Sequence, residues 1–284
     1  MKTCLLITTY KRPTQLNNSL ERICNLTIPD EVLIIDDGSQ DNTEQIVKSF
    51  EGRLPIRYIY NNNPEHSICS FARNIGVKNT DADIIITSEP ELIFVTDIVK
   101  QMLEDRLQYP NEVISAGVVY HAQDQTVFNP GLVTDPVTAL KGEIVENYQT
   151  EPRSYHQSGY VKTKNMQATF VALYERKWLL EVGGWDEDFP GAWGMDDIEL
   201  CTRLRINGIN QHICPEMEVL HQWHPHLLPH LMGKALQEND EYFKSKQLNI
   251  VEQDIFEQKR LETYKQIDPR LIANKSHEWG VIKP

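Results

Sequence analysis

Three uninterrupted apolar runs constrain the fold of this chain more than any other feature. They are TCLLITT (residues 3–9), EVLIIDD (31–37) and ADIIIT (82–87), and none of them alternates polar with apolar residues. Continuous runs of this kind are typical of strands that are covered on both faces, as in a parallel sheet. Parallel strands need crossover connections, so the segments between the runs should be helices.

Those connecting segments carry helix signals. Residues 13–25 begin with a proline and keep their leucines on one face, and residues 41–50 follow the turn-forming sequence GSQDNT. Residues 67–79 form the third such segment. The alternation predicts a doubly wound α/β half, with a mainly parallel sheet, over roughly the first hundred residues.

The second part of the chain is less regular. We expect a strand at 112–121, and a strand, a turn and a short helix over 166–184. Another strand is expected at 217–224, where it runs into polar, histidine-rich chain. Residues 122–165 are polar and punctuated by Pro and Gly, which favours a mobile loop on the acceptor side.

This pattern predicts one domain over residues 1–225, followed by a helical C-terminal extension over 226–284. Within the domain we expect two halves, residues 1–100 and residues 101–225. The composition is that of a globular protein, with 24% charged residues and no excess of Gly or Pro.

The charge and cysteine content narrow the partners and the compartment. The 28 basic and 41 acidic residues give a net charge of −13, which disfavours a nucleic-acid acceptor without excluding one. The five cysteines are scattered and form no CxxC pair, so we expect reduced thiols and a cytoplasmic location. No apolar stretch approaches the roughly 18–20 residues of a membrane span.

Polar clusters follow three of the expected strands. Ligands of open parallel sheets bind beyond the carboxyl ends of the strands, and these clusters should share that edge. Any one cluster alone could be explained by the polar residues that turns at strand ends require. Together the three clusters indicate a nucleotide site. The clusters are Thr8-Thr9-Tyr10 with Arg12 just after, Asp36-Asp37-Gly38-Ser39, and Ser88-Glu89-Pro90-Glu91.

A helix is expected over residues 196–207, with two acids in its first turn. Glu199 and Arg203 are spaced i,i+4 on this helix, and we expect them to pair on its surface. Favourable interaction with the helix dipole would explain an acid there, at about 0.3–1 kcal/mol each.

The stretch GGWDEDFPGAWGMDD leads into that helix and has two interpretations. Trp185 and Trp193 could be a buried pair that caps the helix. Alternatively, they and Gly194 form a flat platform for a sugar ring, next to Asp196 and Asp197, because glycines let a loop approach a ligand closely. We favour the platform.

The residues quoted so far resemble a known family. LLITTYKRP, VLIIDDGSQDNT and FARNIGV resemble the start of the GT-A glycosyltransferases, family 2 in particular. GGWDEDFPGAWGMDDIELCTRLRINGI is similar to a segment of polypeptide N-acetylgalactosaminyltransferases, chondroitin-polymerase domains and β-1,4-galactosyltransferases. The resemblance covers roughly residues 3–224. It implies a GT-A, Rossmann-like sheet flanked by helices, with a nucleotide-binding half over residues 1–100 and an acceptor or catalytic half over residues 101–225.

The resemblance also implies roles for individual residues. Arg73 and Asn74 would lie near the base or the diphosphate of a nucleotide sugar. The nucleoside itself would be held by Thr8, Thr9, Tyr10, Arg12, Asp36 and Asp37.

A divalent cation, Mn²⁺ or Mg²⁺, would lie where the family has Asp-x-Asp. This chain has Glu89-Pro90-Glu91 there, and Glu91 matches the second Asp. His221 stands where relatives supply a metal-binding histidine. Two alternatives stay open: a polar surface histidine, or a structural zinc site formed by Cys214 with the nearby histidines. Those are His212, His224, His226 and His230.

The implied activity is transfer of a sugar, from a UDP-sugar in the first instance, to a saccharide or another hydroxyl-bearing acceptor. Asp197, with Asp196 beside it, would act as the base. Family 2 implies inversion, but the polypeptide-modifying relatives retain configuration, so the outcome stays open. The alternatives are a non-catalytic module that binds a nucleotide sugar or a carbohydrate, and a nucleotidyltransferase. TTYKRP lacks the glycines that a triphosphate loop needs, which argues against the latter.

Overall fold

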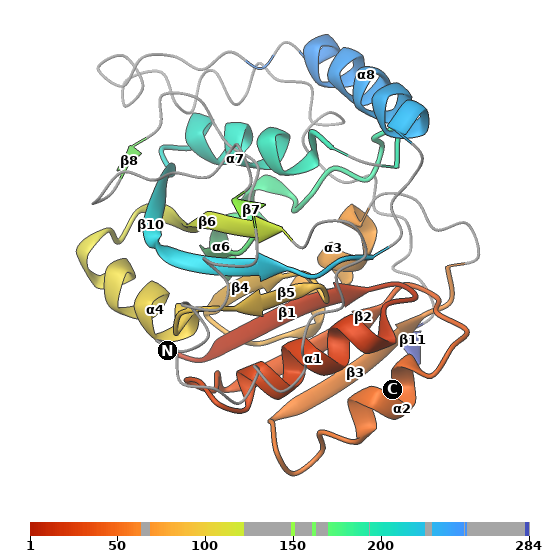
Figure 1. The fold of residues 1–284 in the computed structure, drawn as a ribbon. Coiled ribbons are helices and arrows are strands. Elements are labelled where there is room, and N and C mark those ends of the chain that lie inside the picture. Colours follow the sequence, from red (N-terminus) through yellow and green to blue (C-terminus); the bar gives the residue numbers. More distant parts are fainter. Residues whose placement is uncertain are drawn as a thin grey trace.

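The protein has three layers, a mixed sheet between two layers of helices, as Figure 1 shows. The sheet order is β11-β3-β2-β1-β4-β9-β6-β10-β5, with β7 paired to β6 and β8 paired to β10. This computed structural model describes residues 1–63, 69–121, 149–150, 161–162, 170–192, 194–224, 229–246, 248 and 282–283.

The first half is a parallel sheet in the order β3-β2-β1-β4. Its strands are β1 (Thr3–Thr9), β2 (Glu31–Asp36), β3 (Ile56–Asn61) and β4 (Ile84–Ser88). The helices of this half are α1 (Pro13–Ile23), α2 (Thr43–Lys48) and α3 (Ser70–Asn79).

The second half is mixed. β9 runs antiparallel to β4 and β6, β6 runs parallel to β10, and β5 runs antiparallel to β10. The strands are β5 (Leu92–Phe94), β6 (Glu112–His121), β7 (Gln149–Thr150), β8 (Val161–Lys162), β9 (Ala172–Glu175), β10 (Asn210–His221) and β11 (Ile282–Lys283). The helices are α4 (Ile98–Gln108), α6 (Arg176–Val182), α7 (Asp196–Ile206) and α8 (Pro229–Ser245).

Both faces of the central strands are buried, which is why their sequences are continuously apolar. In β1, Leu5 and Ile7 pack into one core with α1, α2 and α4, whereas Cys4 and Leu6 pack into the other with α3, α6 and α7. Each fully buried aliphatic side chain of this kind contributes about 1.5–3 kcal/mol. The predicted fold class is therefore confirmed.

The sheet also brings together the strand ends beyond which a ligand is expected to bind, and we call that place the crevice. β1 lies between β2 and β4, so successive connections leave it in opposite directions. Thr9 pairs with Asp36, and Ile7 pairs with Ser88, so the carboxyl ends of the three strands meet at one edge. Open α/β sheets bind ligands at such a switch point.

Some expectations differ from the structure or lie outside it. β3, β5 and α4 were not predicted, and β10 begins seven residues earlier than the expected strand at 217–224. Most of the expected loop at 122–165 and most of the extension beyond residue 248 lie outside the described residues. The domain boundary at 225/226 stays a prediction. In the described part of the chain, no helix has the length and apolar character to cross a membrane.

Candidate active site

The carboxyl ends of β1 and β2 form one wall of the site. The backbone N–H of Asp37 donates to the carbonyl of Thr9 (2.9 Å), which continues the sheet pairing past the end of β2. Asn61 and Asn63 donate to the Asp37 carboxylate, at 2.7 Å and 3.1 Å. These contacts hold the Asp37 carboxylate in a fixed orientation at the end of β2, and its role in holding a nucleoside stays a prediction.

Asp36 already has hydrogen-bond partners within the protein, and its expected contact with the nucleoside stays a prediction. It is 1% exposed. Its carboxylate accepts hydrogen bonds from the hydroxyl of Tyr58 (2.6 Å) and from the backbone N–H of Ser39 (2.8 Å). Burial raises the pKa of its carboxyl group, and those hydrogen bonds oppose the shift. Asp36 therefore supports the turn that carries Asp37.

The turn after β1 carries polar groups that suit a ligand. The hydroxyls of Thr9 and of Ser70, at the start of α3, are buried and have no hydrogen-bond partner among the described residues. Thr8 is buried and Tyr10 is half-buried at the same turn. Buried hydroxyls are nearly always hydrogen-bonded, so these two indicate a place for ligand oxygens or nitrogens.

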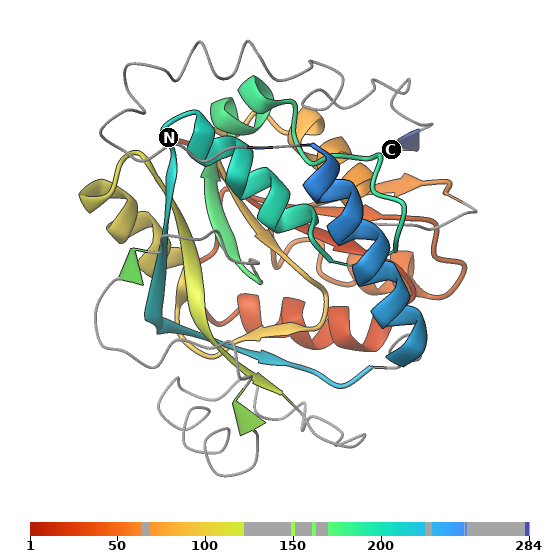
Figure 2. The same ribbon diagram turned by 90° about the horizontal axis from the view of Figure 1, so that it is seen from above.

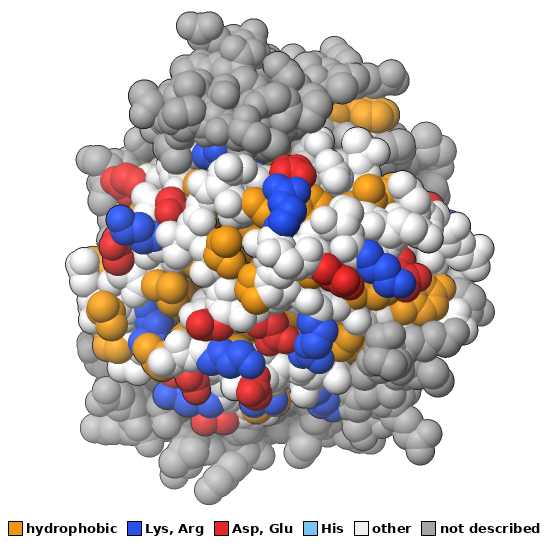
Figure 3. Space-filling model, turned by 90° about the horizontal axis from the view of Figure 1, so that it is seen from below, with side chains coloured by type: hydrophobic (Ala, Val, Ile, Leu, Met, Phe, Trp, Pro, Cys, Tyr) orange, Lys and Arg blue, Asp and Glu red, His pale blue; other side chains and the backbone are white. Residues whose placement is uncertain are grey.

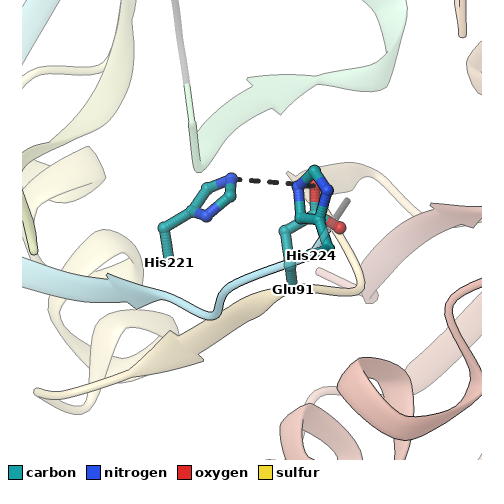
Figure 4. A group of neighbouring side chains, drawn as sticks. All are labelled: Glu91, His221 and His224. Atoms are coloured by element: carbon teal, nitrogen blue, oxygen red, sulfur yellow. Dashed lines mark ion pairs between the residues drawn. The ribbon is translucent and has the colours of Figure 1, made fainter. Parts of the chain in front are cut away.

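A carboxylate and two imidazoles converge where the turn after β4 meets the end of β10. Glu91, His221 and His224 each place a potential ligand atom within 4.8 Å of the others, and we call them the metal cluster (Figure 4). Nε2 of His224 lies 3.4 Å from Oε1 of Glu91, and Nε2 of His221 lies 3.8 Å from it. Ligands at about 2.1 Å from one ion lie roughly 3–4 Å apart, so these side chains could share a cation.

The environment of Glu91 favours its charged form. Burial by itself would raise the pKa of this carboxyl group, but the hydrogen bond from His224 and the charges of both histidines hold the pKa below its ordinary value. Arg12 approaches from the turn after β1, with Nη2 3.1 Å from Nδ1 of His224. Arg12 therefore links the turn after β1 to the metal cluster.

Glu89 pairs outside the metal cluster, so its expected role as a ligand stays a prediction. Its carboxylate pairs with Arg73 (3.3 Å), and the same guanidinium pairs with Asp196 (3.0 Å) and Asp197 (2.9 Å). We call these four residues the acid cluster. Burial, and then the charge of Glu91, raises the pKa of Glu89 to about 8. Burial and the charge of Asp197 raise the pKa of Asp196 to about 6.

Asp197 is oriented by two donors on one oxygen. Arg73 and the indole N–H of Trp185 both donate to Oδ1, at 2.9 Å and 3.0 Å. Oδ2 accepts no hydrogen bond from the described residues, so it is the oxygen that can take a proton. Asp197 was predicted as the base, and its place beside the crevice fits that role.

The aromatic platform is not supported at Trp185. This side chain is 0% exposed and packs edge-on against Tyr174, with ring centroids 5.7 Å apart. Trp185 cannot offer a face to a sugar and is buried, as in the interpretation that we did not favour, whereas the pair as a whole stays a prediction. Trp193 lies outside the described residues, and Gly194 belongs to the loop that leads into α7.

Asn74 has a structural role, and its expected place near the donor stays a prediction. Its side chain is 1% exposed, accepts the backbone N–H of Trp185 (2.8 Å), and donates to the Trp185 carbonyl (2.8 Å). It thereby fixes the loop that carries Trp185. Arg73, one residue earlier on α3, is the member of the predicted pair that reaches the site.

Two other predictions about side chains need revision. Glu199 and Arg203 do pair i,i+4, at 2.7 Å, but both are buried, so the pair is not a surface pair. Cys214 is remote from the metal cluster and donates to Glu216 (3.3 Å), so the cluster found among the described residues is not the cysteine–histidine zinc site considered above.

Sequence reasoning treated His224 as one of several polar surface histidines. The signal that could have identified it is its place three residues after His221, where β10 has just ended. A chain that leaves a strand can turn a later residue back toward the strand end. The sequence alone does not show which of the neighbouring histidines does so.

The fold is that of GT-A glycosyltransferases. S. aureus TarS 1–349 in complex with UDP-GlcNAc superposes with a TM-score of 0.65 at 13% identity, over 93% of this chain and 72% of that one. The mannosyltransferase PcManGT from Pyrobaculum calidifontis, in complex with GDP-Man and Mn²⁺, gives a TM-score of 0.51 at 15% identity, over 77% and 56%.

The sequence identifies the family. The model of glycosyl transferase family 2 matches residues 4–180, and the chain belongs to this family of nucleotide-sugar-dependent glycosyltransferases. Hyaluronan synthase of Pasteurella multocida is 27% identical over 70% of this chain. Chondroitin synthase of Escherichia coli is 28% identical over 72% of it. The chain spans only 22% and 32% of the length of these two relatives.

Proposed function

We propose that this glycosyltransferase uses a UDP-sugar and a divalent cation, and that Asp197 activates the acceptor hydroxyl in an inverting displacement. One observation carries the proposal: the Glu89-Pro90-Glu91 turn joins the two clusters. Glu91 belongs to the metal cluster and Glu89 to the acid cluster, so the sites for diphosphate and base adjoin.

The residues of the metal cluster fit Mn²⁺ better than Mg²⁺. The set is one carboxylate and two imidazoles, and imidazole suits the softer transition ions, whereas Mg²⁺ prefers oxygen ligands. A bound cation supplies positive charge against the departing diphosphate. Arg12 is placed to release His224 and to pair with phosphate oxygens as the donor binds.

The nucleoside half of the donor would lie against β1 and β2. Asp37 is fixed there by two asparagines, and the buried hydroxyl of Thr9 has no partner in the described part of the chain. A carboxylate can accept a hydrogen bond from the N–H of a pyrimidine base, and a hydroxyl can either donate or accept one. TarS, a structural relative, was solved with UDP-GlcNAc, which supports a uridine donor.

The acceptor step depends on Asp197. Oδ1 is held by Arg73 and Trp185, so Oδ2 has a fixed direction from which to accept the hydroxyl proton. Preorganised general bases contribute about 10²–10⁴-fold to the rate. Attack on the face opposite the leaving diphosphate inverts the anomeric carbon.

We propose a saccharide acceptor. Two of the relatives are named hyaluronan synthase and chondroitin synthase, which supports an acceptor that carries sugar hydroxyls. On the face drawn in Figure 3, the described acidic and basic side chains are interspersed and do not form a basic stripe, so this face gives no support to a nucleic-acid acceptor.

The test is donor hydrolysis and thermal shift with UDP-, GDP- and CDP-sugars, each with Mn²⁺ and with a chelator. We expect a shift and hydrolysis with a UDP-sugar and Mn²⁺, and at least a tenfold loss of hydrolysis in His221→Ala. His212→Ala, a buried histidine of the same strand outside the metal cluster, is the matched control. Hydrolysis that survives the chelator unchanged would contradict the metal role, and preference for GDP- or CDP-sugars would contradict the donor.

A further inference from the structure

The loop that delivers Asp197 has an unusual backbone. It spans residues 183–195, and we call it the acid loop. Gly183, Gly184 and Gly194 have φ values of 83°, 75° and 88°, and Met195 has a φ of 72°. A non-glycine residue rarely adopts this left-handed conformation unless its surroundings impose it. α7 follows directly, and its first turn has no side-chain cap.

α8 supplies the missing restraint. Figures 1 and 2 show α8 beside α7 on the same side of the sheet. Asn239 of α8 is 0% exposed and holds the acid loop with three hydrogen bonds. Its Oδ1 accepts the backbone N–H of Gly191 (2.6 Å), and its Nδ2 donates to the carbonyls of Gly191 (3.1 Å) and Gly194 (2.8 Å).

The contact is close enough to require glycine. A Cβ on Gly191 would lie 2.5 Å from the carbonyl oxygen of Ala235 and 2.8 Å from Oδ1 of Asn239. The backbone of the acid loop therefore rests on the backbone of α8. α8 therefore fits closely against the acid loop at this one position along the loop.

Buried charges lock the end of the helix. Lys246, just past α8, is fully buried and pairs with Asp186 of the acid loop and with Glu199 of α7. The hydroxyl of Tyr242 donates to Asp186 (3.0 Å), and its ring packs edge-on against Phe189 at 5.1 Å. Glu199 also pairs with Arg203. The network therefore contains two acidic and two basic side chains, and their charges cancel.

We propose that α8 is a clamp that sets the position of Asp197, with Asn239 as the positioning residue. The carbonyl of Gly194 that Asn239 holds is three residues before Asp197. Asn239 fixes the backbone on the N-terminal side of α7, and Arg73 and Trp185 fix the side chain from the other side. The inference rests on the proposed function only where it gives Asp197 the role of base.

Asn239→Ala tests the clamp, and Gln237→Ala is its matched control. Gln237 is exposed on the same helix and donates to Glu241 (3.0 Å) within α8. In Asn239→Ala we expect amide exchange at Gly191 and residues 194–197 to be at least tenfold faster, with β1 and β4 unchanged. We expect kcat for sugar transfer to fall at least tenfold with the KM for the donor unchanged, because small misplacements of a catalytic group are costly. Gln237→Ala should leave both quantities at wild-type values.

Tyr242→Phe is the milder second variant, in case Asn239→Ala does not fold. It keeps the ring and removes only the hydroxyl, and it should speed exchange in the acid loop and lower kcat in the same direction by a smaller factor. Unchanged exchange in the acid loop, or wild-type kcat in a folded Asn239→Ala protein, would overturn the clamp. Faster exchange in a protein whose wild-type form transfers no sugar would uphold the clamp and count against the proposed function instead.

Discussion

The metal cluster and the acid cluster lie on either side of Pro90, and they are built in opposite ways. In the acid cluster, Arg73 pairs with three carboxylates, so each side chain is held before any substrate arrives. In the metal cluster, the ligand atoms of Glu91, His221 and His224 gather around one point, with Arg12 at its edge. Ion pairs with Arg73 therefore hold the proposed base in place, whereas the side chains of the metal cluster leave room for the proposed cation.

The largest expected effect comes from removing the centre of the acid cluster. Arg73→Met leaves three carboxylates around a buried site without their counter-charge, and we expect it to lower the free energy of unfolding by about 3–5 kcal/mol. Arg53→Met removes an exposed pair with Glu21 and should cost at most about 1 kcal/mol. Urea denaturation of both variants checks this. Equal losses would mean that the acid cluster is not preorganised by Arg73.

Asp197→Asn should come next. We expect kcat to fall at least about a hundredfold, equivalent to roughly 2.7 kcal/mol, with the Kd for the donor within about twofold of wild type. Asp240→Asn, an acid of α8 whose pair with Lys244 lies on the surface, is the control. Transfer rates and donor titration measure the two quantities, and near-wild-type transfer by Asp197→Asn would remove the proposed base.

The two glutamates themselves give the third test. Glu91→Gln should weaken Mn²⁺ binding about 10–100-fold, because a charged ligand is lost, whereas Glu89→Gln should change it by less than about threefold. Calorimetric titration of Mn²⁺ into the two proteins, whose substitutions lie two residues apart in the same turn, makes the comparison direct. If Glu89→Gln had the larger effect, our division between the clusters would be wrong.

The smallest effect concerns pH. The pKa of Glu89 is raised to about 8 in the folded protein, so folding stabilises its protonated form. That contribution is fully present below the unfolded pKa of about 4.3 and is lost as the pH rises toward 8. In chelator, the Tm of wild type should therefore fall more between pH 6 and pH 8 than that of Glu89→Gln, by on the order of 2 °C. Parallel Tm profiles would contradict the assignment.

The strands that could be predicted from the sequence are those in which every residue is buried. β1, β2 and β4 are covered on both faces, so their runs are continuously apolar and easy to recognise. β3 was missed because IRYIYN is only partly buried and β5 was missed because it has three residues. Short or half-buried strands leave a weak signal, since packing against their neighbours decides them.

In the site, the sequence identified side chains but not their directions. Glu89 and Glu91 are chemically identical and were expected to act together, yet the turn at Pro90 sends them to different clusters. The i,i+4 spacing of Glu199 and Arg203 predicted a pair, but nothing local shows that Lys246, nearly fifty residues later, covers it. Long-range contacts of this kind are what residue spacing cannot reveal.

A crystal structure with Mn²⁺ and UDP, with anomalous diffraction data at the manganese edge, tests the central claim most directly. We predict one anomalous peak within about 2.0–2.4 Å of the Glu91 carboxylate and of both imidazoles. Glu89 should still pair with Arg73, and the diphosphate should lie between the peak and Asp197. A peak ligated by Glu89, or one remote from His221 and His224, would contradict the account.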